Sequence, residues 1–498
     1  MTHCFLLRMN KLIILAASVS CLVLSSNSCP AQSARQTNAV LNGQVIDHVE
    51  CLNDSSQSYA LYLPSNYTHD RKWPILYAFD PSGRGKTPVE RFKDAAEKFG
   101  WIVAGSNNSR NGPWPPSVEA WKAISADTHQ RFSIDDARMY ATGFSGGARV
   151  AIGISQLCQD CFAGVIACSA GFPFGLTPST QMRFLFFGTT GVDDFNFPEL
   201  KGLDGQLAKA GITHRIAVFD GRHEWPPADV ATDALEWMEL HAMKLGKRTR
   251  DEKLIASSWE RMIKQAESLV ASKPYPAYQI YLSLAETLKG LRDVTEVESR
   301  GGRLRESREV KEAIRDEQME ISKQEEFEAQ LNSFIAARRE RNGDDANSRR
   351  DNRSSGSTDD EETLERESRS HALINKLRVQ AKASEDSSTR RIARRALDGV
   401  FVALFEQGSG WLQNQKHYRE AATTFKLATE INPDRAGAFY YLAWAYAAAG
   451  DKKKALQALN AAIDKGFSDL TAIGNNQAFA SIRSDAQYQG IIGRLQKK

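Results

Sequence analysis

The sequence predicts an α/β domain built on a doubly wound, mostly parallel sheet, followed by an all-α region. From about Tyr59 to Lys247, short runs of strand-forming residues alternate with helical patterns, which is typical of a parallel sheet covered by helices. After Lys247 the strand-forming runs become rare, and charged helical sequence replaces them. The chain has 498 residues, more than one hydrophobic core normally organises, so we expect at least two structural units.

Seven runs in the first half of the chain have the composition of strands. They are residues 58–64, 74–79, 101–106, 138–144, 164–170, 183–189 and 214–220. Several of them are continuously apolar, as expected for strands buried on both faces. Helical patterns lie between them, and the last pattern ends at Gly246. We therefore assign residues 40–250 to the α/β domain.

The first 31 residues have the pattern of a secretory signal peptide. Arg8 and Lys11 precede an apolar run at 12–24, and small residues lead up to Ala31. The apolar run is shorter than a comfortable membrane span. We expect cleavage near Ala31 and a secreted or periplasmic protein with no stable membrane span. An uncleaved anchor and a lipoprotein are the alternatives.

Four cysteines remain once that segment is removed: Cys51, Cys158, Cys161 and Cys168. Thiols in an exported chain suggest disulfides, although the spacing leaves their pairing open. The Cys158-x-x-Cys161 spacing also fits a zinc or redox motif. However, the chain has no second cysteine pair for zinc, and no strand leads into this one as a thioredoxin-type motif requires. A structural bridge is the favoured interpretation.

The segment that follows the α/β domain is dominated by charge. Residues 251–341 mix both signs at short spacing, which is typical of solvent-exposed helix faces. Residues 342–368 contain almost no large apolar side chains, so we predict a disordered linker there. The whole chain carries a formal charge of +3, from 64 Lys and Arg against 61 Asp and Glu. This balance argues against a dedicated nucleic-acid-binding protein.

The last part of the chain, residues 369–498, contains an internal repeat with a period of 34 residues. The paired positions are Tyr418 and Lys452, Ala421 and Ala455, Phe425 and Leu459, and Ala428 and Ala462. The two copies resemble the tetratricopeptide repeat over about residues 402–468, with Phe405 and Ser409 in place of the usual Trp and Gly. This resemblance implies stacked helix pairs whose concave surface could bind a protein partner.

The segment GFSGG places Ser145 between Gly143 and Gly147. A Gly-x-Ser-x-Gly motif is a weak signal on its own, but here an expected strand runs directly into the serine and a helical pattern follows it. This order is typical of a nucleophile elbow, in which the serine backbone is strained and its neighbours must be small. An ordinary turn that contains a serine is the alternative.

Candidate partners for Ser145 follow the next expected strands. A serine hydroxyl becomes a good nucleophile only beside a base, and the base needs a carboxylate to orient it. One strand-end loop carries Asp193 and Asp194, and a later one carries His223. The carboxyl ends of parallel strands meet at one edge of a sheet, so we expect these side chains to converge on Ser145.

The serine comes first along the chain, then the aspartates, then the histidine. With the residues in this order, the segment from Ser58 to Gly246 resembles the α/β-hydrolase family, in particular secreted esterases of the polyhydroxybutyrate-depolymerase and feruloyl-esterase kind. The resemblance is carried by YALYLPSNY, PILYAFDPSGRG, GFSGGARVA, GTTGVDDFNFPE and FDGRHEW. It implies Ser145 as nucleophile, His223 as base and one of the paired aspartates as acid. Asp194 is favoured, because the Phe-Pro pair after it lies at the family's usual distance, and Asp193 is the alternative.

The resemblance also implies an oxyanion hole, with one N–H donated by Gly146. The second donor should come from the loop after the strand at 74–79. Where the family usually has His-Gly, this chain has Asp80-Pro81. Because Pro81 has no N–H, we expect Ser82 or the following glycine to donate instead.

Other residues near the expected site have less specific signals. The loop at 106–116 follows a strand on the same edge, so Trp114 and Arg110 are candidate substrate contacts, with a plain Asn- and Pro-rich turn as the alternative. The sequence around His223 could begin a zinc motif, but Pro227 stands where a second histidine would be needed. We expect neither a metal nor an organic cofactor.

Taken as a whole, the sequence predicts an exported serine hydrolase that cleaves a small-molecule or polymeric carboxylic ester through an acyl-enzyme. A serine peptidase could use the same three side chains, because fold does not determine substrate. The alternative from another class is a non-catalytic protein that binds a partner through its helical repeats.

Overall fold

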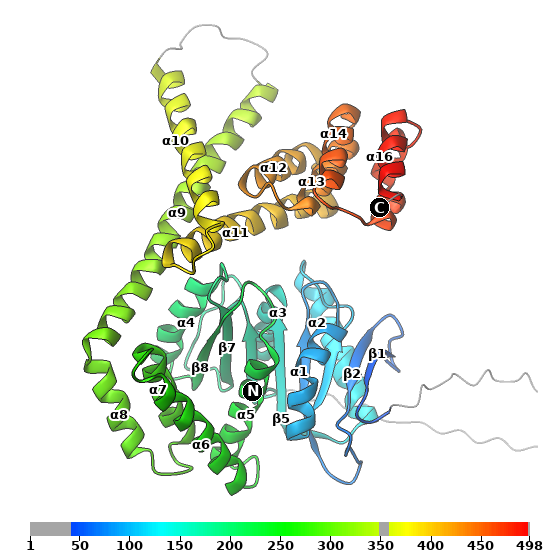
Figure 1. Cartoon of the computed structure of the whole chain (residues 1–498). Coiled ribbons are helices and arrows are strands. Elements are labelled where there is room, and N and C mark those ends of the chain that lie inside the picture. The colour runs from blue at the N-terminus through cyan, green and yellow to red at the C-terminus, as the bar shows by residue number, and fades with distance from the viewer. Residues whose placement is uncertain (1–40, 348–357, 497–498) are drawn as a thin grey trace, which may run out of the picture. The chain divides into compact units, whose positions relative to one another are not determined.

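An eight-stranded sheet forms the first half of the chain in this computed structural model (Figure 1). The structure describes residues 41–347 and 358–496, so the expected signal peptide lies outside the described residues. The strands are β1 Val45–Glu50, β2 Ser58–Tyr62, β3 Trp73–Phe79, β4 Ile102–Ser106, β5 Ile134–Phe144, β6 Gly164–Cys168, β7 Leu185–Gly191 and β8 His214–Phe219.

The strand order across the sheet is β1-β2-β4-β3-β5-β6-β7-β8. Strand β2 pairs antiparallel with β1 and β4, and the other neighbours pair in parallel. The carboxyl ends of the parallel strands therefore lie along one edge of the sheet. Crossover helices connect most of these parallel strands. They are α1 Lys86–Phe99, α2 Trp114–Arg131, α3 Gly146–Leu157 and α4 Phe197–Lys209. Helix α5 Ala228–Lys244 follows β8, the last strand.

Helices cover both faces of the sheet, as adjacent residues of β3 illustrate. Leu76 is fully buried in a core that includes Phe92 of α1 and Met238 of α5. The hydroxyl of the next residue, Tyr77, lies 2.9 Å from the hydroxyl of Thr128 in α2. Successive strand side chains point to opposite faces, so these helices belong to different layers.

The seven strands expected from the sequence all form, with ends that differ by a few residues. The fold is that of an α/β hydrolase, which confirms the predicted fold class. Strand β1 was not predicted. Its residues, VIDHVE, are mostly exposed or half-buried, so they lack the apolar run that identified the buried strands.

The next helices after α5 are α6 Glu252–Leu269, α7 Pro274–Leu288, α8 Thr295–Glu306 and α9 Arg308–Asn347. Despite their charge, α6 and α7 share an apolar core with α5. Leu240 of α5, Met262 of α6 and Leu284 of α7 are buried in it. This contact attaches the charged helices to the α/β domain.

The segment predicted as a disordered linker, 342–368, is helical where the structure describes it. Helix α9 continues to Asn347, and α10, Thr358–Ala381, begins inside the predicted linker, while residues 348–357 lie outside the described residues. The charged composition suggested disorder, but Glu and Arg are good helix formers. Both helices also extend from packed segments, and packing stabilises helices more than propensity does. The packed residues are Leu331, Phe334, Ile374 and Leu377.

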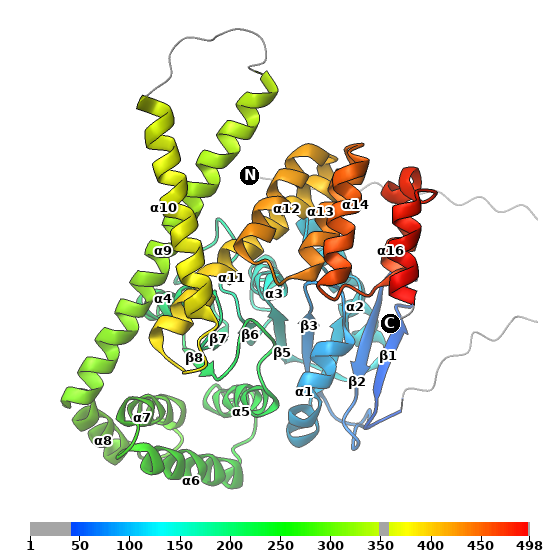
Figure 2. The ribbon, with the colours of Figure 1, turned by 45° about the horizontal axis from the view of Figure 1, so that its top comes forward.

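The repeat region consists of helices that pack side by side (Figure 2). They are α11 Ser388–Ser409, a π-helical turn at Gly410–Gln415, α12 Tyr418–Ile431, α13 Ala436–Ala448 and α14 Lys452–Asp464, followed by α15 Leu470–Asn475, a 3₁₀ turn at Gln477–Ile482 and α16 Ala486–Gln496. The two sequence copies correspond to α12 and α14. Phe425 and Leu459, at equivalent positions, are both fully buried in one core.

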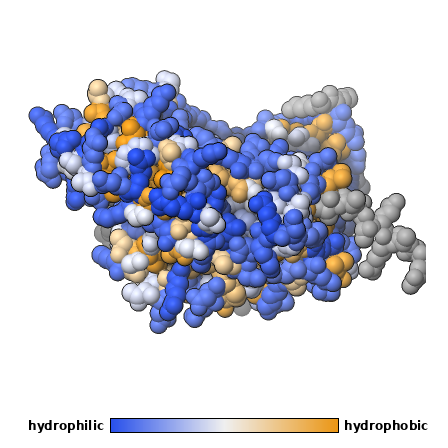
Figure 3. Space-filling view, turned by 90° about the horizontal axis from the view of Figure 1, so that it is seen from below, coloured by the Kyte–Doolittle hydropathy of each residue, from blue (hydrophilic) through white to orange (hydrophobic). Residues whose placement is uncertain are grey.

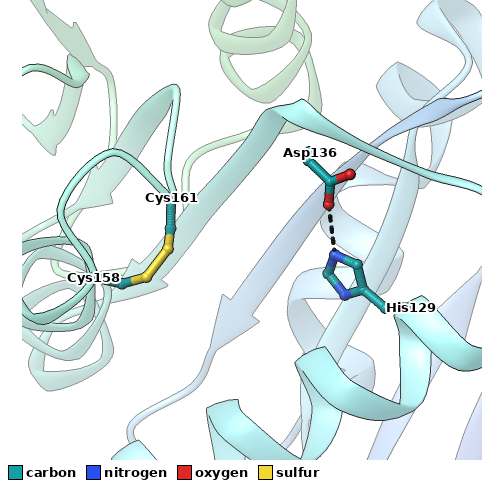
Figure 4. The surroundings of a disulfide bond; sticks show 4 residues. All are labelled: His129, Asp136, Cys158 and Cys161. Carbon is teal, nitrogen blue, oxygen red and sulfur yellow. Dashed lines mark hydrogen bonds and ion pairs between the residues drawn. A yellow bond between two sulfur atoms is a disulfide. The ribbon is translucent and has the colours of Figure 1, made fainter. Parts of the chain in front are cut away.

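Cys158 and Cys161 form a disulfide just after α3 (Figure 4), as the structural interpretation of this pair predicts. Cys51 and Cys168 are buried and not bridged. In the part of the chain that the structure describes, no helix is long and apolar enough to cross a membrane. The face shown in Figure 3 is mostly hydrophilic, with hydrophobic residues scattered over it.

Candidate active site

Ser145 occupies the turn between β5 and α3, at the carboxyl edge of the sheet. Its backbone has φ 53° and ψ −122°, a conformation that is rare for residues other than glycine. Its N–H donates to the carbonyl of Cys168, at the end of the neighbouring strand β6, at 2.8 Å. The turn is thus fixed in a strained conformation, as in a nucleophile elbow.

The two glycines beside Ser145 are required by close backbone contacts. A Cβ atom on Gly143 would lie 2.0 Å from the carbonyl oxygen of Gly147. A Cβ atom on Gly147 would lie 2.0 Å from the carbonyl oxygen of Phe79 in β3. No side chain fits at either position unless the backbone moves, which explains the residue spacing around the serine.

The loops after β7 and β8 bring a carboxylate and an imidazole to Ser145. His223 Nε2 lies 2.9 Å from Ser145 Oγ, and His223 Nδ1 lies 2.9 Å from Asp194 Oδ1. Asp194 is fully buried, and its Oδ1 also accepts the N–H of Asn196 at 2.9 Å. The hydroxyl, imidazole and carboxylate therefore form one continuous hydrogen-bonded chain.

Aromatic rings enclose the imidazole of His223. The Phe144 ring lies 4.7 Å and the Phe195 ring 4.1 Å from it, measured between centroids. The His223 side chain is only 20 % exposed. The hydrogen bonds on both of its nitrogens are thus partly shielded from water, which strengthens their electrostatic component.

Asp193, the alternative acid, faces away from the imidazole. Its Oδ2 accepts a hydrogen bond from Arg394 Nη1 of α11 at 2.7 Å. Its N–H donates to the carbonyl of Gly221, which lies in the same loop as His223, at 2.9 Å. Of the two aspartates, the structure thus places only Asp194 against His223.

Gly146, the expected oxyanion donor, is the first residue of α3. The first N–H groups of a helix have no partner within that helix, so the helix leaves this N–H available for the expected role. The N–H groups expected as second donor both have partners in this structure, since Ser82 N–H donates to Asp80 Oδ1 at 2.9 Å and Gly83 N–H donates to Asp80 O at 3.1 Å. The buried Asp80 carboxylate closes this turn and engages the N–H that the sequence assigned to the oxyanion.

Asn111 lies beside Gly146, and the sequence analysis did not single it out. A Cβ atom on Gly146 would come 1.8 Å from Asn111 Oδ1. The Asn111 N–H donates to the carbonyl of Pro81 at 2.8 Å, and its Nδ2 donates to Glu406 Oε1 of α11 at 3.2 Å. The only available signal was its place in the loop at 106–116.

Ser145 opens into a cleft of about 1120 Å³. Both candidate substrate contacts, Trp114 and Arg110, line it together with other residues of the α/β domain. The opposite wall comes from the helices after this domain. Its residues include Glu328 and Asn332 of α9, Val402, Ala403, Phe405 and Glu406 of α11, and Tyr441 of α13. The cleft is therefore formed by both halves of the chain.

Among the residues that the structure describes, no three His, Cys, Asp or Glu side chains are grouped closely enough to hold a metal ion.

A family model of the tetratricopeptide repeat matches residues 412–473, which span α12, α13 and α14. The repeat resemblance is thereby confirmed for this segment. No curated protein sequence matches the chain.

Several solved structures of hydrolases match part of the chain. A ferulic acid esterase is 18 % identical with a TM-score of 0.34, covering 39 % of this chain and 97 % of that one. The S-formylglutathione hydrolase from Staphylococcus aureus is 14 % identical with a TM-score of 0.31, covering 36 % and 92 %. The feruloyl esterase module from Clostridium thermocellum is 15 % identical with a TM-score of 0.31, covering 39 % and 85 %.

Proposed function

We propose that this protein is a serine hydrolase that cleaves carboxylic esters. The observation that carries the proposal is the chain of two 2.9 Å contacts from Ser145 Oγ through His223 to Asp194. A hydroxyl, an imidazole and a buried carboxylate in this order form the catalytic unit of serine hydrolases on several unrelated folds. The strained backbone of Ser145 and the adjacent N–H of Gly146 add the other two features of such a site.

In this mechanism His223 Nε2 accepts the hydroxyl proton while Ser145 Oγ attacks the ester carbonyl. Asp194 keeps the proton on Nδ1 and stabilises the imidazolium that forms. The Gly146 N–H donates to the oxyanion. The imidazolium then protonates the departing alcohol, which leaves the acyl group on Ser145. Water attacks this acyl-enzyme with His223 again as the base, and the carboxylic acid is released.

A fluorophosphonate probe and an activated ester test this function. We expect the probe to label Ser145 in the full chain and p-nitrophenyl butyrate to be hydrolysed, with both signals lost in Ser145→Ala. Ser268→Ala is a suitable control, because its hydroxyl donates to Gln265 O of its own helix, far along the chain from the site. Labelling or turnover that persists in folded Ser145→Ala would refute the proposal.

Hydrolysis of amides is the enzymatic alternative. A peptide anilide offered beside the ester distinguishes the two, because the poorer amine leaving group needs stronger protonation by His223. We expect turnover of the ester only.

The tetratricopeptide match favours a second role in protein binding.

We also propose export, on the basis of the basic and apolar pattern of the first 31 residues. N-terminal sequencing of the protein recovered from its native compartment tests export, and residue 32 is the expected first residue.

A further inference from the structure

The loop after β7, which carries Asp194, is held by side chains from outside the α/β domain. Three donors reach it from helices α9 and α11. Along the chain they are 129, 201 and 203 residues away from their acceptors. The acceptors are the residues immediately around Asp194.

Arg395 of α11 is one of the buried donors. Its side chain is 1 % exposed, and both its Nε, at 2.6 Å, and its Nη2 donate to the carbonyl of Val192. The guanidinium lies over the Phe197 ring, 3.9 Å from the centroid, and Glu320 of α9 lies 3.5 Å from its Nη1. A buried cation is stable only when such partners surround it, so the Arg395 side chain is held against this loop.

Arg394 and Gln324 hold the residues on either side of Asp194. Arg394 Nη1 donates to Asp193 Oδ2 at 2.7 Å. Gln324 Nε2, on α9, donates to the carbonyl of Phe195 at 2.9 Å, and Gln324 is fully buried. Asp194 therefore lies between Asp193, which is bound to α11, and Phe195, which is bound to α9.

We propose that Arg394, Arg395 and Gln324 are positioning residues for Asp194. Helices α9 and α11, which carry them, thereby complete the active site of the α/β domain. The catalytic role of these three residues rests on the hydrolase function proposed above. Their restraint on the loop can be measured without turnover.

The physical reason is that a carboxylate orients an imidazole only while its own backbone is fixed, to within about 0.5 Å for an efficient site. The loop lies beyond the end of β7, so the carbonyls of Val192 and Phe195 have no ladder partner in the sheet. Without the helices they would bond to water, and exposed backbone of this kind opens readily. The three side chains replace that water with fixed donors.

Hydrogen–deuterium exchange of the full chain tests the restraint. In Gln324→Leu and in Arg395→Met we expect amides of residues 191–197 to exchange about fivefold faster, as the loss of one hydrogen bond implies. Arg391→Met is the matched control, because Arg391 lies on the same helix and pairs with the same Glu320 at 2.7 Å without a bond to the loop.

The expected result is faster exchange in both variants and wild-type exchange in the control, with β5 protected in all. Gln324→Leu changes no charge and keeps the side-chain volume, so it remains informative if Arg395→Met fails to fold. Loop exchange equal to that of wild type in Gln324→Leu would overturn the proposal.

Steady-state kinetics on p-nitrophenyl butyrate test the catalytic part. In Arg394→Gln the Asp193 carboxylate loses its hydrogen-bonded cation, so the loop that carries Asp194 loses one of its anchors. We expect kcat to fall about fivefold, as the loss of one hydrogen bond implies, with little change in KM, and Arg394→Lys to retain most of the wild-type kcat. A kcat in Arg394→Gln equal to that of wild type would contradict positioning. If the wild type lacks turnover, the hydrolase function fails, and the exchange result alone decides whether the helices hold the loop.

Discussion

Asp193 and Asp194 are adjacent in the chain, but their side chains bind different partners. Asp194 Oδ1 lies 2.9 Å from Nδ1 of His223, whereas Asp193 Oδ2 lies 2.7 Å from Nη1 of Arg394. Both carboxylates are buried, with 0 % of Asp194 and 7 % of Asp193 exposed. One aspartate thus faces the proposed catalytic base, and the other joins the α/β domain to helix α11.

The two asparagine variants should therefore differ strongly. In Asp194→Asn the amide cannot hold His223 in the required tautomer, and we expect kcat to fall by about 10³- to 10⁴-fold. Asp193→Asn keeps the His223 contact and should lower kcat by about tenfold at most. Steady-state kinetics on p-nitrophenyl butyrate, with melting temperatures as the control for folding, measure the difference. Equal losses in both variants would contradict the assignment of Asp194.

The glycines around Ser145 should tolerate no side chain. In Gly147→Ala the new Cβ would lie 2.0 Å from the Phe79 carbonyl, so β3 or the turn has to move. We expect a loss of about 3 kcal/mol in the free energy of unfolding, or failure to fold. Gly202→Ala in α4 is the control, because its Cβ meets nothing within 4 Å and alanine favours helix. Denaturant unfolding should show destabilisation in the first variant and none in the second.

The wall formed by α11 should determine which esters enter the cleft. Ala403 is an exposed α11 residue on that wall, so Ala403→Trp narrows the cleft without disturbing a core. We expect kcat/KM for p-nitrophenyl octanoate to fall about tenfold or more and that for the acetate to change little, since removing room costs more for the larger acyl group.

Lys426→Trp, on an exposed face of α12 away from the cleft, is the matched control for the added indole. If Ala403→Trp and Lys426→Trp give the same ratio of octanoate to acetate turnover, α11 plays no part in selecting the substrate.

Local sequence patterns were sufficient for all strands of the sheet except β1, and for the prediction that Ser145, His223 and Asp194 come together. Apolar runs mark buried strands, strand ends mark the edge where a site forms, and small residues mark the elbow at Ser145. The α11 wall and the Arg395 contact were beyond such patterns. An arginine in a charged helical segment usually faces solvent, and nothing local indicates that Arg395 lies under the loop at Val192, 203 residues away. The pattern around the expected second oxyanion donor likewise did not indicate that buried Asp80 would accept the N–H of Ser82.

The stability of the protein should fall in mild acid because of His241. This residue of α5 is 3 % exposed, and its Nδ1 donates to the carbonyl of Trp237 at 2.9 Å. Burial lowers the pKa of His241 from 6.5 to about 4. His241 therefore becomes protonated near pH 6.5 in the unfolded chain but only near pH 4 in the folded chain. The free energy of unfolding is highest above pH 6.5 and decreases as the pH falls from 6.5 to 4.

The pKa difference corresponds to about 3 kcal/mol at the acidic end of this pH range. In His241→Leu the backbone N–H remains bonded along the helix, and no proton can bind, so we expect a flatter dependence of stability on pH between 6.5 and 4. Urea unfolding at intervals across this range measures the slopes. If the wild type and His241→Leu have parallel curves, protonation of His241 is not the cause of acid destabilisation, and other groups that change pKa on folding would have to account for it.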